Sequence, residues 1–437
     1  MELPTTMIDR KYDDEFFNRD VERWNDECLR RWNDTPQTFP EGLDRYSPEE
    51  QSRQEQHIEQ TISRVSSVYE HRNNLTQAER AEFRDRMRSS LLGSLIREVD
   101  EETERFMNEC ERTAHEFADA ANAFDSSLPM EDVHQALRNQ WVFNSIQRLF
   151  ERPLTMTPSS FAYSMLYPFT DNMIDAANQS RENIEAFLSW LSDRLAGVPN
   201  RSRNKAIVPV DRLIVMIERE FPRSSHPVVY QTLRAIHAGQ KKGVLLRGGR
   251  ITGGETELLA ITFLKGGTSV LVDGCLISGD LDEELAMCTF LYGVALQMLD
   301  DLQDLVEDDQ TDSSTAFTRA ARQGRLEKTV NQFLNFLQAT LASGLERPDG
   351  GQKPIIDLMT RSCLYLALEA IARQRQRFDA AYLSRIAEHM PLRIDYLAQA
   401  KDRMTGVVAQ VQSRAAIIHT SPLAFATGND LRRRAVL

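Results

Sequence analysis

The fold is decided by residues 281–306, which read LDEELAMCTFLYGVALQMLDDLQDLV. An apolar stripe recurs along this segment in steps of three and four residues, formed by Leu281, Leu285, Cys288, Tyr292, Ala295, Leu299 and Leu302. This spacing is that of one face of an α-helix. Because Val294, Leu296 and Met298 add apolar residues beside the stripe, the segment predicts a helix that is buried nearly all round.

A second stripe on the same segment ends in carboxylates. Gly293, Gln297, Asp300 and Asp304 follow the same steps, and Asp301 is adjacent. At 100° per residue, Asp300 and Asp304 lie about 40° apart around the helix. Like charges on a poorly solvated face repel one another unless a positive charge lies between them. We therefore predict Asp300, Asp301 and Asp304 as ligands of divalent cations, with a solvated helix end as the alternative.

A second DDxxD string follows at Asp308-Asp309-Gln-Thr-Asp312. It lies beyond the predicted helix in a polar stretch that has no apolar frame. Runs of charge in such a setting are usually solvated. We interpret this second string as an exposed loop.

Another acidic pair, Asp171 and Asp175, is spaced i, i+4 on a predicted helix over 158–178. Alone, the pair is typical of an ordinary solvent-facing helix. The 129 residues between Asp171 and Asp300 are enough for several helices, so a bundle could place both acidic sets on opposite walls of one cavity. Carboxylate oxygens suit Mg²⁺, and no His/Cys cluster suggests zinc.

Between the acidic helices runs Lys265-Gly-Gly-Thr268-Ser269, inside an apolar helix. Each glycine weakens a helix by about 1 kcal/mol relative to alanine. A break at this point would free backbone groups and, with Lys265, Thr268 and Ser269, would bind a diphosphate. The alternative is close helix packing with a lysine that reaches to solvent.

The composition indicates a folded, helical chain. Of 437 residues, 41% are apolar and 27% charged, and 20 Gly with 16 Pro are too few turn formers for many short strands. We predict an all-α fold, with residues 1–55 as a charged N-terminal extension and 56–437 as a single helical catalytic domain. The predicted helices are 56–72, 77–124, 131–150, 158–178, 181–196, 209–220, 226–241, 254–275, 281–306, 312–346, 354–374 and 391–414.

Charge and cysteine content narrow the functional classes. The net charge of −13 argues against binding to nucleic acid, which requires an excess of basic residues. Five cysteines without a CxxC pair favour a reducing compartment, and the acidic N-terminus has no signal core, so we expect a cytoplasmic protein. No apolar run approaches the roughly 18 residues of a membrane span, so none is expected.

The run from Gly293 to Asp304 resembles the second aspartate-rich motif of the class I isoprenoid synthases, including the Gln three residues ahead of the first Asp. Asp171 and Asp175 resemble the DxxxD first motif of squalene- and phytoene-synthase-like members. The resemblance implies a helical bundle around a central cavity and three Mg²⁺ ions, which Mn²⁺ can replace. It also implies diphosphate contacts from a set of polar side chains, namely Lys265, Thr268, Ser269, Gln297, Arg393 and Lys401.

Departures from the family narrow the expected reaction. The Arg-Arg-Gly of chain-elongating members does not follow Asp175, the NSE/DTE motif of ordinary cyclases is missing, and the C-terminal residues contain no membrane anchor of the squalene-synthase kind. The chain is therefore most similar to an atypical sesquiterpene cyclase, of the fungal humulene-forming kind. The expected activity is Mg²⁺-dependent cyclisation of farnesyl diphosphate with release of diphosphate.

Aromatic faces stabilise carbocations, so aromatic residues near the motifs are predicted to line the cavity. They are Phe161, Tyr167, Phe169, Phe263 and Phe290, each of which could equally be plain core. Two other functions stay open: a squalene-like enzyme that couples prenyl units head to head, and a non-catalytic helical scaffold. The sequence leaves substrate length, product and a homodimer undecided.

Overall fold

The computed structural model describes residues 14–70, 100–175, 180–198, 207–243, 254–344, 352–397 and 399, and within them the chain forms helices and no strand. This confirms the all-α class. The helices are, in chain order, α2 (Asp14–Asp34), α3 (Pro48–Glu70), α5 (Glu101–Phe124), α6 (Met130–Leu149), α7 (Pro158–Asp175), α8 (Arg181–Leu195), α9 (Ile207–Glu220), α10 (Pro227–Gly243), α11 (Glu255–Ser278), α12 (Glu283–Gln303), α13 (Leu305–Gln310), α14 (Ala316–Arg322), α15 (Leu326–Gly344), α16 (Lys353–Arg373), η3 (Arg375–Arg377) and α17 (Ala380–Ala387).

Helix α12 contains the stretch that the sequence singles out. Its N-cap is Asp282, whose carboxylate accepts a hydrogen bond from the backbone N of Leu285 at 2.8 Å. At its other end Asp304 leaves the helical conformation, with φ −95° and ψ 7°, and α13 begins at the next residue. The predicted helix over 281–306 is therefore correct in its core, and a second short helix follows it.

Helices α11 and α12 form an antiparallel hairpin whose close crossing depends on glycine. A Cβ on Gly293 would lie 2.1 Å from the carbonyl oxygen of Gly266, and a Cβ on Gly267 would lie 2.4 Å from the Phe290 ring. No side chain can occupy such a space. The expected helix break at this point is wrong, because α11 continues without interruption from Glu255 to Ser278. The glycines serve helix packing, which was the alternative interpretation.

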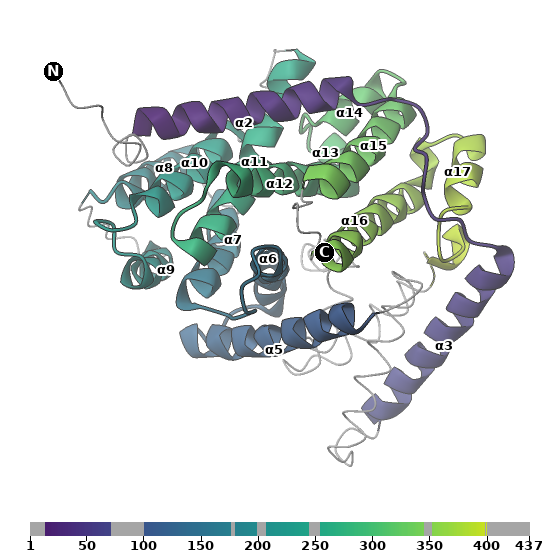
Figure 1. The fold of residues 1–437 in the computed structure, drawn as a ribbon, viewed down its shortest axis with the longest axis horizontal. Coiled ribbons are helices and arrows are strands. Elements are labelled where there is room, and N and C mark those ends of the chain that lie inside the picture. Colours follow the sequence, from purple (N-terminus) through teal and green to yellow (C-terminus); the bar gives the residue numbers. More distant parts are fainter. Residues whose placement is uncertain are drawn as a thin grey trace.

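The other helices surround this hairpin. Helix α2 crosses one side of it, while α6 and α16 lie on the opposite side and α10 packs along α11 (Figure 1). Helix α7 packs against α6 and α9. The hairpin therefore lies at the centre of the bundle, which explains why both of its helices are apolar on most faces.

Two tryptophans attach α2 to the bundle. Trp24 packs against Phe290 of α12 with ring centroids 6.1 Å apart, and its indole N–H donates to Glu283 at 3.0 Å. Trp32 packs against Phe263 of α11 at 6.1 Å and Phe336 of α15 at 5.5 Å. The charged N-terminal part of the chain thus places an apolar face on the core.

An extended segment, residues 35–46, continues from α2 along α15. Side-chain amides of α15 donate to backbone carbonyls in and next to this segment: Gln332 to Trp32 at 2.8 Å, Asn335 to Pro36 at 3.1 Å and to Thr38 at 2.8 Å, and Gln338 to Glu41 at 3.3 Å. Helix α2 and this segment together are called the N-terminal belt below. Helix α3 follows, so the expected boundary at residue 55 falls inside a helix.

Helices α11 and α12 are, among the described helices, long and apolar enough to cross a membrane. Most of each is buried inside the bundle (Figure 1). Core helices pass the same test of length and composition, and their burial here explains the apolar sequence.

Candidate active site

The end of α12 and the start of α13 bring together Asp300, Asp301, Asp304 and Asp308, which we call the acidic cluster. Asp300, Asp304 and Asp308 are spaced four residues apart, and the backbone N–H of Asp308 donates to the carbonyl of Asp304 at 2.8 Å. Because the hydrogen bonding continues through the kink at Asp304, Asp308 is placed near the carboxylates of α12. The first DDxxD string is thus joined by one residue of the second.

Asp301 is the most buried member, with 8% of its surface exposed. Its Oδ1 accepts a hydrogen bond from Nε2 of Gln297 at 2.8 Å. Burial raises the pKa of Asp301 to about 7, and the charge of Asp300 adds to this, while Lys265 and the Gln297 hydrogen bond act in the opposite direction. A buried carboxylate here lacks enough positive charge to hold it ionised.

Asp308 corrects the interpretation of the second DDxxD as an exposed loop. Burial raises its pKa to about 8, and the charges of Asp301, Asp304 and Asp300 raise it further. The rest of that string does face outward: Asp309 pairs with Arg322 at 3.2 Å. It also pairs with Arg377 at 2.9 Å, and Asp312 pairs with Arg322 at 3.1 Å.

Two cations lie beside the acidic cluster. Lys265 of α11 lowers the pKa of both Asp301 and Asp308 by its charge. Arg138 of α6 places Nη2 3.7 Å from Oδ1 of Asp300. Arg138 belongs to no motif in the sequence, so sequence reasoning missed it. The four carboxyl groups of the acidic cluster outnumber these two cations.

The acidic cluster offers the type of ligand atom that a hard divalent cation prefers. Raised pKa values of carboxyl groups in a partly buried site indicate that the site has too little positive charge to keep them ionised. Carboxylate oxygens are ligands that suit Mg²⁺. Within the described residues, no three His, Cys, Asp or Glu side chains are grouped closely enough to hold an ion by themselves. Helix α7 carries Asp171 and Asp175, but their side chains lie outside the described residues.

Thr268 and Ser269 do not have the free hydroxyl groups expected of a diphosphate site. Thr268 is completely buried, and its Oγ1 donates to the carbonyl of Leu264 at 2.6 Å. It faces α10, where a Cβ on Gly239 would lie 3.4 Å from this hydroxyl. The Ser269 hydroxyl donates to the carbonyl of Gly266 at 2.6 Å. Both groups satisfy their own helix, so we leave them out of the proposed site.

Arg393 also has another partner than the expected diphosphate. Its Nε donates to both carboxylate oxygens of Glu55 at 2.9 Å, and Nη2 donates to the same carboxylate. This ion pair connects the residues after α17 to α3. We therefore leave Arg393 out of the proposed site, and Lys401 lies outside the described residues.

The predicted aromatic residues divide between two faces of the bundle. Phe263 and Phe290 pack against Trp32 and Trp24 of the N-terminal belt, so they are core residues on the outer side of the hairpin. Phe161 lies 5.0 Å from Phe117 of α5. A further ring of α5, Phe124, contacts Phe161 and Phe169, and Tyr167 is half-buried. These contacts favour the alternative of plain core packing for Phe263 and Phe290, and their place in a cavity wall stays a prediction.

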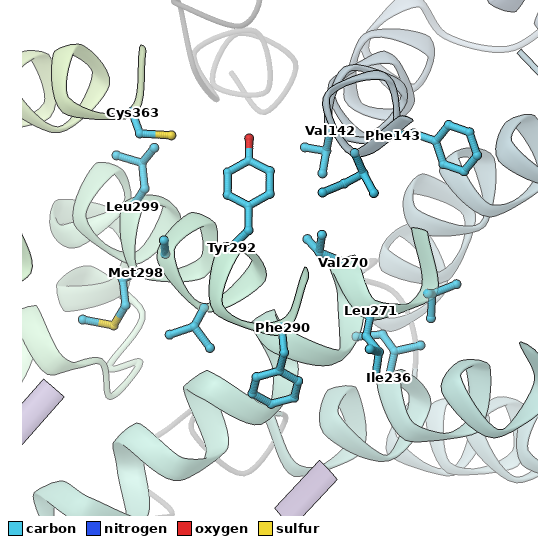
Figure 2. Close-up of a cluster of buried hydrophobic side chains, with 14 of the residues drawn as sticks. Val142, Phe143, Ile236, Val270, Leu271, Phe290, Tyr292, Met298, Leu299 and Cys363 are labelled. Carbon is cyan, nitrogen blue, oxygen red and sulfur yellow. The ribbon is translucent and has the colours of Figure 1, made fainter. Parts of the chain in front are cut away.

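Tyr292 is a buried aromatic residue of α12. Figure 2 shows its ring projecting from α12 between Val142 of α6 and Cys363 of α16, whereas Phe290 projects to the opposite side. Burial raises the pKa of Tyr292 well above its usual value. The residue belongs to the apolar stripe in the sequence, where nothing distinguished it from the other core positions.

Comparison with protein-family models, with curated proteins and with solved structures finds no match to this chain. The assignment of a function therefore depends on the residues of the site.

Proposed function

We propose that the protein is a Mg²⁺-dependent class I terpene cyclase, which ionises farnesyl diphosphate and cyclises the cation to a sesquiterpene hydrocarbon such as humulene. The observation that carries the proposal is the acidic cluster with Lys265 and Arg138 beside it. A surplus of partly buried carboxylates beside two cations is suited to a polyanion that arrives with metal ions. The central cavity and the class I bundle are part of this proposal.

The residues divide the chemistry between them. Loss of diphosphate from an allylic carbon develops negative charge on the leaving group, and Mg²⁺ held by the acidic cluster supplies the Lewis acid that neutralises it. Lys265 and Arg138 donate charge-assisted hydrogen bonds to diphosphate oxygens. Gln297 orients Asp301 by binding one of its carboxylate oxygens and leaving the other open. The Tyr292 ring and its apolar neighbours exclude water and stabilise the cation.

The location of the enzyme is also a proposal. All five cysteines are free thiols and are buried. Unpaired cysteines are typical of a reducing compartment, which supports a cytoplasmic enzyme.

The experiment is a turnover assay with purified protein, Mg²⁺ and the C10, C15 and C20 allylic diphosphates. Diphosphate release is measured by a coupled assay and hydrocarbons by gas chromatography with mass spectrometry. We expect a C15 hydrocarbon from farnesyl diphosphate, complete loss of activity in EDTA, and recovery with Mg²⁺ or Mn²⁺. Asp300→Asn should lower kcat by about a hundredfold, about 2.7 kcal/mol, while Asp309→Asn in the outward-facing string should change it less than about twofold.

Other outcomes would select other functions. A C30 hydrocarbon from farnesyl diphosphate alone would indicate head-to-head coupling, and transfer of labelled isopentenyl diphosphate into a longer diphosphate would indicate chain elongation. Full turnover in excess EDTA would contradict the metal-dependent mechanism. No diphosphate release, together with a melting temperature that Mg²⁺ does not change, would favour a helical scaffold.

A further inference from the structure

Asp273 is a completely buried carboxyl group on α11. Its Oδ1 accepts a hydrogen bond from Nδ2 of Asn139 on α6 at 3.2 Å, and the same amide donates to the hydroxyl of Ser164 on α7 at 3.1 Å. Its other oxygen, Oδ2, has no hydrogen-bond partner among the described residues. The carboxyl group therefore has one donor and one unused oxygen inside the bundle.

The surroundings of Asp273 disfavour a charge. Its neighbours along α11, Val270, Leu271 and Val272, are all buried. Burial raises the pKa of Asp273 well above its usual value, and the Asn139 hydrogen bond opposes this, so the apolar surroundings favour the protonated form of the carboxyl group. A valine or leucine would suit an apolar helix better. An acid kept at such a position is typical of proton transfer.

The position of Asp273 connects it to the candidate active site. Asn139, which binds it, directly follows Arg138, whose guanidinium lies 3.7 Å from Asp300. Asp273 is also close enough to Tyr292 to influence its pKa. Along α11 it lies eight residues beyond Lys265, about 12 Å along the helix axis. A prenyl chain whose diphosphate lies at Lys265 and Arg138 and which extends inward along Tyr292 would reach Asp273.

Resting on the proposed function, we propose that Asp273 is a further catalytic residue, which exchanges a proton with the hydrocarbon during cyclisation. The first cation loses a proton to the released diphosphate, which gives a neutral cyclic polyene. The O–H bond of Asp273 then breaks as a C–H bond forms at a double bond of that polyene, leaving a new carbocation and a carboxylate. The carboxylate removes a proton from the carbon next to the cationic centre. This C–H bond supplies the electrons of the final double bond and regenerates the acid.

The test uses the full chain with Mg²⁺ and farnesyl diphosphate in D₂O. The carboxyl proton exchanges with solvent before turnover, whereas carbon-bound hydrogens do not, so the wild-type hydrocarbon should carry deuterium. Asp273→Asn keeps the shape and the acceptor for Asn139 but has no acidic proton. We expect the deuterated fraction of the hydrocarbon from this variant to fall at least tenfold relative to the wild type. We also expect more of the neutral intermediate to be released for each diphosphate formed. Asp309→Asn, as a control, should keep the wild-type deuterium content.

The outcomes separate this proposal from the proposed function. If the wild-type protein releases no diphosphate from any allylic substrate, both fail. If it releases diphosphate and forms a hydrocarbon without deuterium, proton exchange alone is overturned. The same holds if the Asp273→Asn product carries as much deuterium as the wild-type product, which is what a purely structural role predicts. The wild-type measurement needs no variant, so it decides the question even if Asp273→Asn fails to fold.

Discussion

Among single residues, Asp308 has the largest consequence for the candidate active site. It belongs by sequence to a solvated string, yet its carboxyl group lies near Asp300, Asp301 and Asp304. The neighbouring Asp309 is held by Arg322 and Arg377 instead. Two adjacent aspartates on one short helix thus have opposite roles, which makes them a matched pair for mutation.

If the proposed function is right, Asp308→Asn should lower Mg²⁺-dependent kcat by about tenfold to a hundredfold, because it removes one of the carboxylates that we propose bind the metal. In the metal-free protein the same change should leave the melting temperature equal or raise it, because a neutral amide avoids the cost of keeping the Asp308 carboxyl group protonated in the folded state. Thermal unfolding with and without Mg²⁺, together with turnover, measures both effects. Asp309→Asn should show neither, and equal losses in the two variants would refute the assigned positions.

The pH dependence follows from the raised pKa values of Asp301, about 7, and Asp308, about 8. An unfolded aspartate loses its proton near pH 4, whereas these two keep theirs in the folded, metal-free protein. Between about pH 4 and pH 8 the folded state therefore binds more protons, and its stability falls as pH rises. Mg²⁺ bound to these carboxylates, as proposed, would have to displace these protons. The rise in melting temperature on adding Mg²⁺ should be larger at pH 8 than at pH 6. An equal rise at both pH values would contradict competition between Mg²⁺ and protons for these carboxylates.

The sequence predicted the main acidic residues because their position in an apolar frame is unusual. Asp300, Asp301 and Asp304 stand out on an otherwise apolar helix, and Lys265 lies in a comparable setting. Arg138 has no such apolar frame around it in the sequence. Its long side chain reaches Asp300 from a helix that is distant in sequence, so no spacing pattern connects the two residues. Asp273 lies among valines and leucines, where a single polar residue gives no spacing pattern.

At the scale of helices, the α11–α12 hairpin depends on the absence of three side chains. Gly266, Gly267 and Gly293 allow the two backbones to meet, and this contact aligns Lys265 with the end of α12. The glycine pair in the sequence was correctly seen as unusual, but its effect on helix propensity proved secondary to packing. Propensity is a weak influence that tertiary contacts often override.

Gly293→Ala should therefore destabilise the protein by about 1–3 kcal/mol or more, since the added methyl group would lie 2.1 Å from a carbonyl oxygen and the helices would have to separate. Activity should fall as well, because the separation moves Lys265 away from the acidic cluster. Gly254→Ala is the control, as a Cβ there meets nothing within 4 Å. Urea unfolding and turnover provide the measurements, and equal stability of the two variants would disprove the packing role.

The helix boundaries show which signals a sequence carries. Helices with a regular apolar period, such as α6, α7 and α16, begin and end within two or three residues of the predicted limits. The predicted helix over 312–346 is instead two helices, α14 and α15, separated at Gly324, which has φ +65°. A glycine inside a periodic pattern did not reveal that the chain turns there, because the apolar residues resume directly after it.

At the scale of the whole molecule, the N-terminal belt connects parts of the chain that are distant in sequence. Trp24 and Trp32 bind the central hairpin, the extended segment follows α15, and Glu55 of α3 binds Arg393 near the other end of the described chain. The described part of the expected N-terminal extension therefore lies on the core and contributes Trp24 and Trp32 to it.

Trp32→Ala should lower the free energy of unfolding by about 3–5 kcal/mol, because a large buried ring is replaced by a cavity between α11 and α15. Arg30→Ala, on the exposed side of the same helix, should have a much smaller effect. Chemical unfolding followed by tryptophan fluorescence and circular dichroism distinguishes the two. A small effect at Trp32 would mean that the belt is dispensable for the fold.

The hydrogen bonds of the belt to α15 also set an order of events during synthesis on the ribosome. Gln332, which binds the carbonyl of Trp32, is 300 residues further along the chain. At a synthesis rate of about 5–20 residues per second, about 15–60 s pass between the synthesis of Trp32 and that of Gln332. During that time its two tryptophans have no core to cover. The ion pairs that Glu27 forms with Arg30 and Arg31 lie within one helix, so they can form before these long-range contacts do.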